Sequence, residues 1–304
     1  MTVGTTSTHQ LGAHLGGGVK GSLDTARRIG LGVGTADGAM GGPIQIWSRN
    51  PSAWKSMAHT EKDVAAFRDG CAALEIGPVF VHGIYLMNFC SADDVLWDKS
   101  VEALADHLTV GARLGAKVVV IHPGSGGTQE LDSALDRCAL AVKLALQQTE
   151  HVKDRPLVGL ETCAGAGKTV GRSFTELAAI MARVDNDPGV AVVLDTAHMW
   201  GSGCDLATEE GLERTMQEML AAFPLERVVG VHANDSKVEL GSQKDRHENI
   251  GQGFIGEAAF ARMLAHPALR GLPWVMEVPG FDGQGPDAPN LQTLRRLAGI
   301  AVPA

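Results

Sequence analysis

The chain alternates short apolar runs with longer amphipathic segments. Eight runs are rich in Val, Ile and Leu and nearly free of polar residues, which predicts buried strands. They cover residues 10–15, 43–47, 78–84, 117–123, 156–162, 190–196, 227–233 and 273–279. Apolar residues at helical spacing predict helices between and after these strands, over residues 61–74, 100–115, 131–148, 173–184, 212–223 and 291–300.

This alternation predicts the fold class. Nearly continuous apolar strands separated by helices are typical of a parallel sheet covered on both faces. Eight such units favour a closed (β/α)8 barrel, the TIM barrel, over an open doubly wound sheet, which is the alternative. The sequence contains no repeat beyond the βα alternation and no domain boundary, so residues 1–304 are expected to form a single domain, with a flexible segment at 1–9.

Composition narrows the class of protein. A hydrophobic fraction of 44% and a charged fraction of 20% describe a globular chain that can bury a large core. No apolar run has the roughly 18 to 20 residues of a membrane span and no signal peptide is recognised at the start, so we expect a cytoplasmic protein. Five widely spaced cysteines without a CxxC pair argue against a disulfide framework. The net charge of −9 does not favour nucleic-acid binding, although bound cations would neutralise acidic ligands.

Titratable residues stand at the ends of six consecutive strands. Each could be structural, as a hydrogen-bonded histidine or a helix cap, but in a barrel all six converge on the face where active sites are built. Three carboxylates gathered there are costly unless cations offset their charge. Imidazole and carboxylate ligands without thiolates favour zinc, or manganese as an alternative. The six residues are His82, His122, Glu161, Asp195, His232 and Glu277.

Two ions sharing a bridging carboxylate would suit phosphate-ester cleavage, but aldose isomerases also use two ions in a barrel. A further set of ligands separates the two reactions. His198 lies three residues after Asp195, and Asp245 and His247 are neighbours of the i, i+2 kind that point the same way in an extended segment. Two imidazoles and one carboxylate leave a coordination position open, as a catalytic zinc requires. Nine ligands therefore indicate three metals, which argues against the alternative function, a two-metal sugar isomerase or epimerase.

Several motifs carry a resemblance that covers nearly the whole chain. They are "YLMNF", "HPGS", "LETCAGAG", "LDTAHMWGSGCDL", "HANDSKVELGSQKDRHENIGQGFIG" and "MEVPG", in this order. With these motifs the chain resembles the endonuclease IV family, the trinuclear-zinc apurinic/apyrimidinic endonucleases also called deoxyribonuclease IV. The glycine-rich "GAHLGGGVKGS" lacks the GK[ST] ending of a phosphate loop, so no nucleotide cofactor is expected.

The resemblance implies the reaction and the site. It implies hydrolysis of the phosphodiester 5′ to an abasic deoxyribose in duplex DNA, leaving a 3′-hydroxyl and a 5′-deoxyribose phosphate. Glu161 and Glu277 would act as the catalytic carboxylates, with Glu161 positioning and helping to deprotonate the attacking water. Three zinc ions would be held, with manganese an alternative at one site: the first by His82, His122 and Glu161, the second by Glu161, Asp195, His232 and Glu277, and the third by His198, Asp245 and His247.

The resemblance also implies where DNA is held. The candidate contacts are Tyr85, Asn50, Lys237 and Arg246. Tyr85 could instead be an aromatic residue of the barrel rim, and the two basic residues could be solvated loop charges. Ser52 stands where the family usually offers a basic or long polar wedge, and the role of His14, at the end of the first strand, stays open. A monomer is expected, since a barrel closes its own sheet edges.

Overall fold

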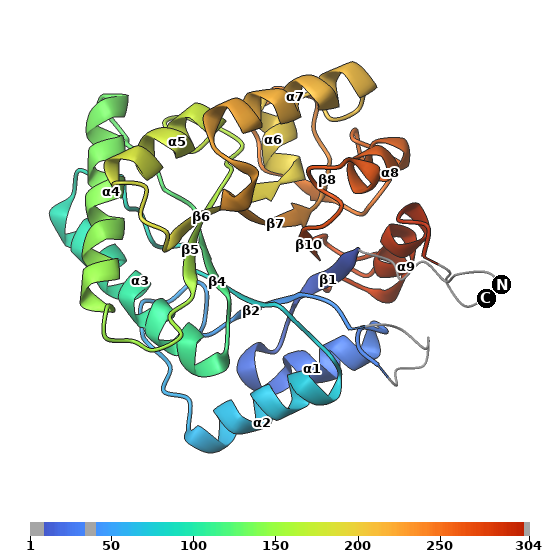
Figure 1. Ribbon diagram of the computed structural model, residues 1–304, viewed down its shortest axis with the longest axis horizontal. Helices are drawn as coiled ribbons and strands as arrows, with labels where there is room; N and C mark the ends of the chain where they lie inside the picture. The colour runs from blue at the N-terminus through green and yellow to red at the C-terminus, as the bar shows by residue number, and fades with distance from the viewer. Residues whose placement is uncertain (1–8, 34–40, 301–304) are drawn as a thin grey trace.

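The computed structural model describes residues 9–33 and 41–300. Within these ranges eight parallel strands close into a barrel, with helices packed around the outside (Figure 1). In the order of the chain the barrel strands are β1 (Gln10–Leu15), β2 (Ile44–Trp47), β3 (Val79–His82), β4 (Val118–Ile121), β5 (Leu157–Glu161), β6 (Val190–Asp195), β7 (Val228–Ala233) and β10 (Pro273–Met276). Around the barrel each strand pairs with its neighbours in the order β1-β10-β7-β6-β5-β4-β3-β2. The eight predicted strands and the TIM-barrel fold are thus confirmed.

The helices connect successive strands on the outside of the barrel (Figure 1). Within the described residues they are α1 (Gly18–Arg28), α2 (Glu61–Ala73), α3 (Asp94–Leu114), α4 (Leu131–Gln148), α5 (Phe174–Arg183), α6 (Thr196–Ser202), α7 (Glu209–Ala222), α8 (Glu257–Ala265) and α9 (Ala288–Leu297), with a 3-10 turn, η1 (Leu225–Arg227), before β7. In the same part of the chain, no helix combines the length and the hydropathy of a membrane span. A flexible segment was expected at residues 1–9. Of these residues, all except His9 lie outside the described part of the chain.

Apolar periodicity located most helices but missed polar first turns. α3 begins at Asp94, earlier than predicted, because the side chain of Asp93 accepts hydrogen bonds from the amides of Val95 and Leu96 and caps the helix. α7 likewise begins at Glu209, where Thr208 is the cap. Helices α1, α6 and α8 were not predicted, since they are short or contain glycine.

The inside of the barrel is filled by a small apolar cluster: Phe80, Val118, Val120, Val193 and Val275. Side chains on a strand alternate between two faces, so the residue two positions further along points to the same side. Four candidate ligands stand in this relation to the cluster, at the carboxyl ends of the strands: His82, His122, Asp195 and Glu277. The inner face of each of these strands therefore changes from apolar to metal-ligating at the barrel mouth.

Two glycines complete this pattern at the remaining ligands. Gly159 precedes Glu161 by two residues, and Gly230 precedes His232 by two residues. A Cβ atom at Gly159 would lie 3.0 Å from Cγ2 of Val193, and one at Gly230 would lie 3.0 Å from Cε1 of Phe80. The larger side chains of the neighbouring strands fill the space that these glycines leave, which keeps the floor beneath the ligands closely packed.

The polar segment after β7 is held together by one buried carboxylate. Two short strands pair antiparallel there, β8 (Asp235–Ser236) and β9 (His247–Glu248). The side chain of Asp235 is fully buried and accepts hydrogen bonds from five backbone amides, those of Ser236, Gly251, Gly253, Ile255 and Gly256. Gly253 has no room for a side chain, because a Cβ atom would meet the carbonyl oxygen of Ser236. The glycines of "IGQGFIG" thus allow a loop to wrap around Asp235.

We expect Asp235→Asn to lower the free energy of unfolding by about 3 kcal/mol, because an amide NH2 would face backbone N–H groups that the carboxylate now accepts from. Urea denaturation followed by circular dichroism measures this difference. The control is Asp282→Asn, which changes an exposed aspartate that accepts a single backbone bond from Gln284. Equal stability of the two variants would contradict the role assigned to Asp235.

Candidate metal centre

Three groups of ligand atoms gather at the mouth of the barrel. Within each group all the atoms lie within 4.8 Å of one another. Glu161 belongs to the first two groups and Asp195 to the last two, so the groups form one continuous cluster. Among the described residues the groups are His82, His122 and Glu161; Glu161, Asp195, His232 and Glu277; and Asp195, His198 and His247.

Strand ends and one short helix position these side chains. Asp195 is the last residue of β6 and the N-cap of α6, where its Oδ1 accepts a hydrogen bond from the amide of His198 at 2.8 Å. The first turn of α6 therefore brings His198 back over the barrel mouth. His247 reaches the site from β9, on the loop that Asp235 organises. Local hydrogen bonding therefore places His198 and His247, two of the predicted ligands that lie outside the barrel strands.

Asp245 occupies a more peripheral position than the other ligands. Its carboxylate oxygens lie 3.2 Å from Nε2 of His198 and 3.1 Å from Nε2 of His247, while 54% of its side chain is exposed. Asp195, from the second group, also lies 3.7 Å from Nε2 of His247. The structure therefore brings His198, Asp245 and His247 together, and it adds Asp195 as a fourth side chain that the sequence had assigned only to the second site.

In most imidazoles of the cluster, one ring nitrogen is within hydrogen-bond distance of a backbone carbonyl oxygen. Nδ1 of His82 lies 2.7 Å from the carbonyl oxygen of Gly83, and Nδ1 of His198 lies 2.8 Å from that of Thr162. Nδ1 of His247 lies 3.3 Å from the carbonyl oxygen of Glu277. A carbonyl can only accept, so each Nδ1 carries the proton and Nε2 is left as the ligand atom. This arrangement is usual for histidines that bind metals.

Two buried atoms of the cluster lack a hydrogen-bond partner. Oε2 of Glu161 accepts no hydrogen bond although Nε2 of His82 and Nε2 of His122 each lie 3.3 Å away, and Nε2 of His247 also has no hydrogen-bond partner. Buried polar atoms in native proteins are almost always paired. These unpaired atoms and the mixed imidazole and carboxylate set fit divalent ions of the zinc type.

The charges of the cluster shift its pKa values strongly. Burial alone would raise the pKa of Glu161, but the imidazoles of His232 and His122 outweigh it and hold that pKa well below its usual range. Burial lowers the pKa of His122 to about 4. For His232 and His247 burial also acts downward, yet the surrounding carboxylates raise both pKa values to about 9. At neutral pH these two imidazoles are therefore protonated in the metal-free protein.

We expect metal binding to release protons at neutral pH, because a metal binds only the neutral imidazole and must displace the protons of His232 and His247. Affinity for zinc should rise with pH up to about 9, by about tenfold per pH unit for each proton displaced. Adding zinc to metal-stripped protein in weakly buffered solution at pH 7 measures the released protons. The absence of proton release at pH 7 would contradict the ion pairs described above.

Comparisons with known proteins agree with this geometry. The family model described as a xylose isomerase-like TIM barrel matches residues 42–298. A relative named probable endonuclease 4, from Nitratidesulfovibrio vulgaris (strain DP4), is 37% identical over 301 residues, covering 95% of this chain and 98% of the relative. The crystal structure of endonuclease IV from Thermus thermophilus superposes with a TM-score of 0.79 at 35% identity, covering 95% of this chain and 99% of that one. The chain belongs to the endonuclease IV family.

Membership in the endonuclease IV family makes the protein an enzyme of the nuclease class. Other barrels are more distant. L-ribulose 3-epimerase superposes with a TM-score of 0.61 at 16% identity, covering 97% of this chain and 84% of that one. A likeness at this level of identity shows the fold alone.

The residues expected to contact DNA lie around the mouth in this endonuclease IV family member. Tyr85 is 65% exposed, with its ring 4.9 Å from that of Trp47, and its amide donates to the carbonyl oxygen of Pro51, which joins the two loops expected to meet DNA. Asn50 is exposed, and its side chain accepts from the amide of Ser52. A cavity of about 270 Å³ opens beside Tyr85, lined also by His14, Trp47, His247 and Glu277.

The two basic candidates lie on the loop between β8 and β9. Nζ of Lys237 lies 3.9 Å from a carboxylate oxygen of Glu248, and the guanidinium of Arg246 donates to the carbonyl oxygen of Asp245. Both side chains have therefore a local partner as well as access to solvent. The structure places them beside the third ligand group without assigning them to DNA.

The structural role of one buried arginine, beneath the loop at residues 48–54, was not predicted from the sequence. Arg49 donates to Nε2 of His107, to the carbonyl oxygen of Trp54 and to that of Ala103, and it thereby fastens this loop to α3. Burial lowers the pKa of His107 to about 3, so the imidazole is neutral and can accept. No motif singles out Arg49, so only its contacts in the fold show that it is structural.

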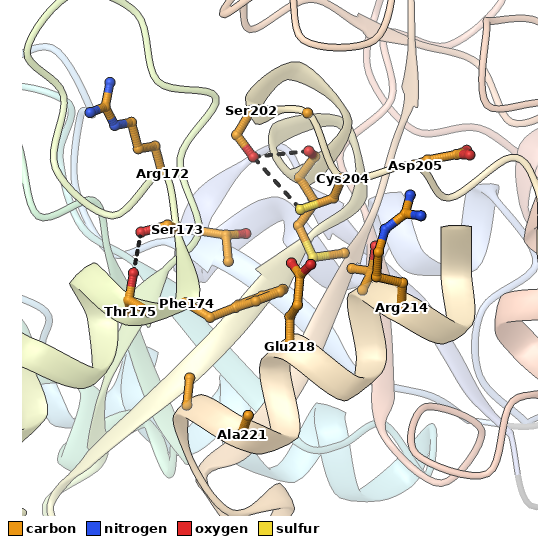
Figure 2. A pocket seen from close by; sticks show the side chains of 15 residues that line it. Arg172, Ser173, Phe174, Thr175, Ser202, Cys204, Asp205, Arg214, Glu218 and Ala221 are labelled. Carbon is orange, nitrogen blue, oxygen red and sulfur yellow. Dashed lines mark hydrogen bonds between the residues drawn. The ribbon is translucent and has the colours of Figure 1, made fainter. Parts of the chain in front are cut away.

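A second and larger cavity, of about 480 Å³, lies outside the metal centre between α5, α6 and α7 (Figure 2). Phe174 and Ala221 lie on one side of it, and Ser202 and Cys204 lie opposite. None of the candidate metal ligands lines this cavity. Its size alone therefore does not make it the active site.

Proposed function

We propose that this nuclease hydrolyses the phosphodiester 5′ to abasic sites in duplex DNA, with three metal ions, and leaves a 3′-hydroxyl and a 5′-deoxyribose phosphate. It would thus serve base-excision repair. The observation that carries the proposal is the continuous cluster of nine candidate ligands at the barrel mouth, in a chain whose relatives are named endonuclease 4. A cytoplasmic location and a monomeric state remain predictions from the sequence.

The ligand set supports two shared carboxylates. Glu161 would join the first and second sites, and Asp195 lies between the second and the third. Bound zinc ions would lower the pKa of a coordinated water and stabilise negative charge on the phosphate oxygens and the departing 3′-oxygen. Zinc fits all three groups, and manganese is an alternative at one of them.

The side chains have separable roles in such a reaction. Glu161, fully buried among His82, His122 and His232, would orient the attacking water and accept its proton at a carboxylate oxygen. Oε1 of Glu277 is occupied by hydrogen bonds from its neighbours, so only Oε2 can assist, next to Nδ1 of His232. The abasic sugar must leave the duplex to reach these atoms, which the missing base makes easier.

We expect Tyr85→Ala to raise the KM for abasic duplex about tenfold while kcat changes little, because an exposed ring on the rim can stack on a base of the distorted duplex. Steady-state kinetics with a fluorescent duplex measure both constants. Tyr85→Phe is the matched control and should behave like wild type. An unchanged KM in the alanine variant would mean that Tyr85 is only a rim residue.

The alternative function, sugar isomerisation or epimerisation, predicts a different metal content. Two ions suffice for that chemistry, whereas the His198, Asp245 and His247 set is useful only with a third. Metal analysis of protein purified without chelators and then dialysed against metal-free buffer separates the two. About three ions per chain support the nuclease proposal, and two or fewer support the isomerase.

A further inference from the structure

A glutamine at the bottom of the metal centre takes no part in the ligand groups, yet it contacts two of their members. Gln45 lies in the middle of β2, between Ile44 and Ile46, and its side chain is completely buried. Oε1 of Gln45 lies 2.9 Å from Nε2 of His232, and Nε2 of Gln45 donates to Oε1 of Glu277 at 2.5 Å. One amide thus bridges ligands from β7 and from the end of β10.

The hydrogen-bonding chemistry of Glu277 and His232 determines which end of the Gln45 amide faces each of them. As a metal ligand Glu277 is a carboxylate, which can only accept, and its Oε1 lies within hydrogen-bond distance of both Nε2 of Gln45 and Nδ1 of His14. The NH2 group of Gln45 must therefore face Glu277, and its carbonyl oxygen must face His232. A carbonyl oxygen also only accepts, so Nε2 of His232 carries a hydrogen.

This hydrogen leaves Nδ1 as the only ligand atom of His232. Nδ1 faces the carboxylates, at 2.7 Å from Oε1 of Glu161 and 3.2 Å from Oε2 of Glu277. His82, His198 and His247 have the opposite arrangement, since their Nδ1 atoms face backbone carbonyls. His232 therefore differs from these three histidines, because its partner is a side-chain amide and lies at Nε2 instead of Nδ1.

The same network restricts Glu277. Besides the bond from Gln45, its Oε1 accepts one from Nδ1 of His14 at 2.9 Å. Two donors occupy Oε1 and leave Oε2 directed toward His232 and the other carboxylates. His14 and Gln45 lie side by side in the register of β1 and β2, so both strands present their polar side chain to the same oxygen.

We propose that Gln45 is a positioning residue of the second metal site, which fixes His232 with Nδ1 and Glu277 with Oε2 toward the ion. Gln45 does not touch the metal or the substrate and acts through these two ligands. The inference rests on the proposed function only in taking the group of Glu161, Asp195, His232 and Glu277 as a metal site. Partners of this kind typically change metal affinity by about 10- to 100-fold.

The first test needs no variant. In zinc-loaded wild-type protein, ¹⁵N NMR of the histidine rings distinguishes imidazoles bound through Nδ1 from those bound through Nε2. We expect His232, assigned by comparison with a His232→Gln sample, to show a zinc-bound Nδ1 and a protonated Nε2. A zinc-bound Nε2 at His232 would overturn the inference.

The second test removes the amide. Gln45→Met keeps a side chain of similar length but can neither accept from His232 nor donate to Glu277, and Gln148→Met, at an exposed position at the end of α4, is the matched control. Competition with a chromophoric chelator measures each zinc affinity, and the visible spectrum of cobalt-loaded protein reports ligand geometry. We expect one of the three sites to bind zinc about 10- to 100-fold more weakly in Gln45→Met and the cobalt spectrum to change.

Unaltered zinc affinities and an unaltered cobalt spectrum in Gln45→Met would overturn the proposal. If that variant does not fold, the NMR result on wild-type protein decides alone. Neither readout depends on DNA cleavage. The role of Gln45 and the proposed nuclease function can therefore be refuted independently of each other. A protein that leaves abasic duplexes intact but shows Nδ1 ligation at His232 refutes the function and supports the role of Gln45.

Discussion

Glu161→Gln should lower kcat for incision of abasic duplex by about 10³-fold or more while leaving the Kd for the duplex nearly unchanged. Three imidazoles surround this carboxylate, at 3.3, 3.3 and 2.7 Å, and its side chain is fully buried. An amide in its place is neutral and offers one oxygen, so it can neither bridge two ions nor accept a proton from water. Single-turnover kinetics together with fluorescence anisotropy separate the chemical step from binding.

The matched control for this variant is another buried glutamate. Glu176 is also buried, but it accepts bonds from the amides of Gly171 and Arg172 and pairs with the Arg172 guanidinium, away from the ligand groups. Glu176→Gln should lower stability and keep turnover within a few-fold of wild type. Near-normal incision by Glu161→Gln would remove Glu161 from the bridging position.

Asp245→Ala should release one metal ion much more readily than the other two and lower kcat by about 10²-fold. The carboxylate of Asp245 contacts only His198 and His247 among the candidate ligands, and it is the most exposed of the nine. Its removal leaves the first two groups intact, because they are built from strand ends. Metal analysis after graded dialysis, with Lys244→Ala from the same loop as the control, measures the occupancy. A uniform loss of all three ions would mean that the centre assembles as a single unit.

The fold and the ring of ligands could be predicted because both depend on local pattern. Strand periodicity determines that a residue two positions beyond Phe80 or Val193 faces the barrel interior, so His82 and Asp195 had to point toward the mouth once the fold was recognised. The i, i+3 spacing of Asp195 and His198 likewise required only the helical turn that follows β6.

Other features depend on contacts between distant parts of the chain. Gln45 is 187 residues from His232 and 232 residues from Glu277, and a single glutamine in an apolar strand gives no indication of such partners. Asp235 appeared only as part of a polar loop, since its five amide donors come from backbone groups whose directions the sequence does not specify. The sequence also did not predict that Asp195 belongs to both the second and the third ligand group. A count of ligands gives their number but not how their side chains are arranged in space.

The contacts with DNA remain predictions for a different physical reason. Tyr85, Asn50, Lys237 and Arg246 lie at or near the barrel mouth, but their roles depend on the shape of a partner. The net charge of −9 does not help, since it includes the carboxylates of a metal centre that cations would neutralise.

The proposed hydrolysis is tested most directly by incision of a duplex that carries one tetrahydrofuran abasic analogue, which cannot undergo β-elimination. Purified protein is assayed as isolated, after prolonged chelation and after zinc is restored. We expect cleavage 5′ to the analogue, loss of activity on chelation, recovery with zinc, and a product with a 3′-hydroxyl that a polymerase extends. An intact duplex with metal-replete protein, or cleavage that survives removal of all bound metal, would contradict the proposed hydrolysis.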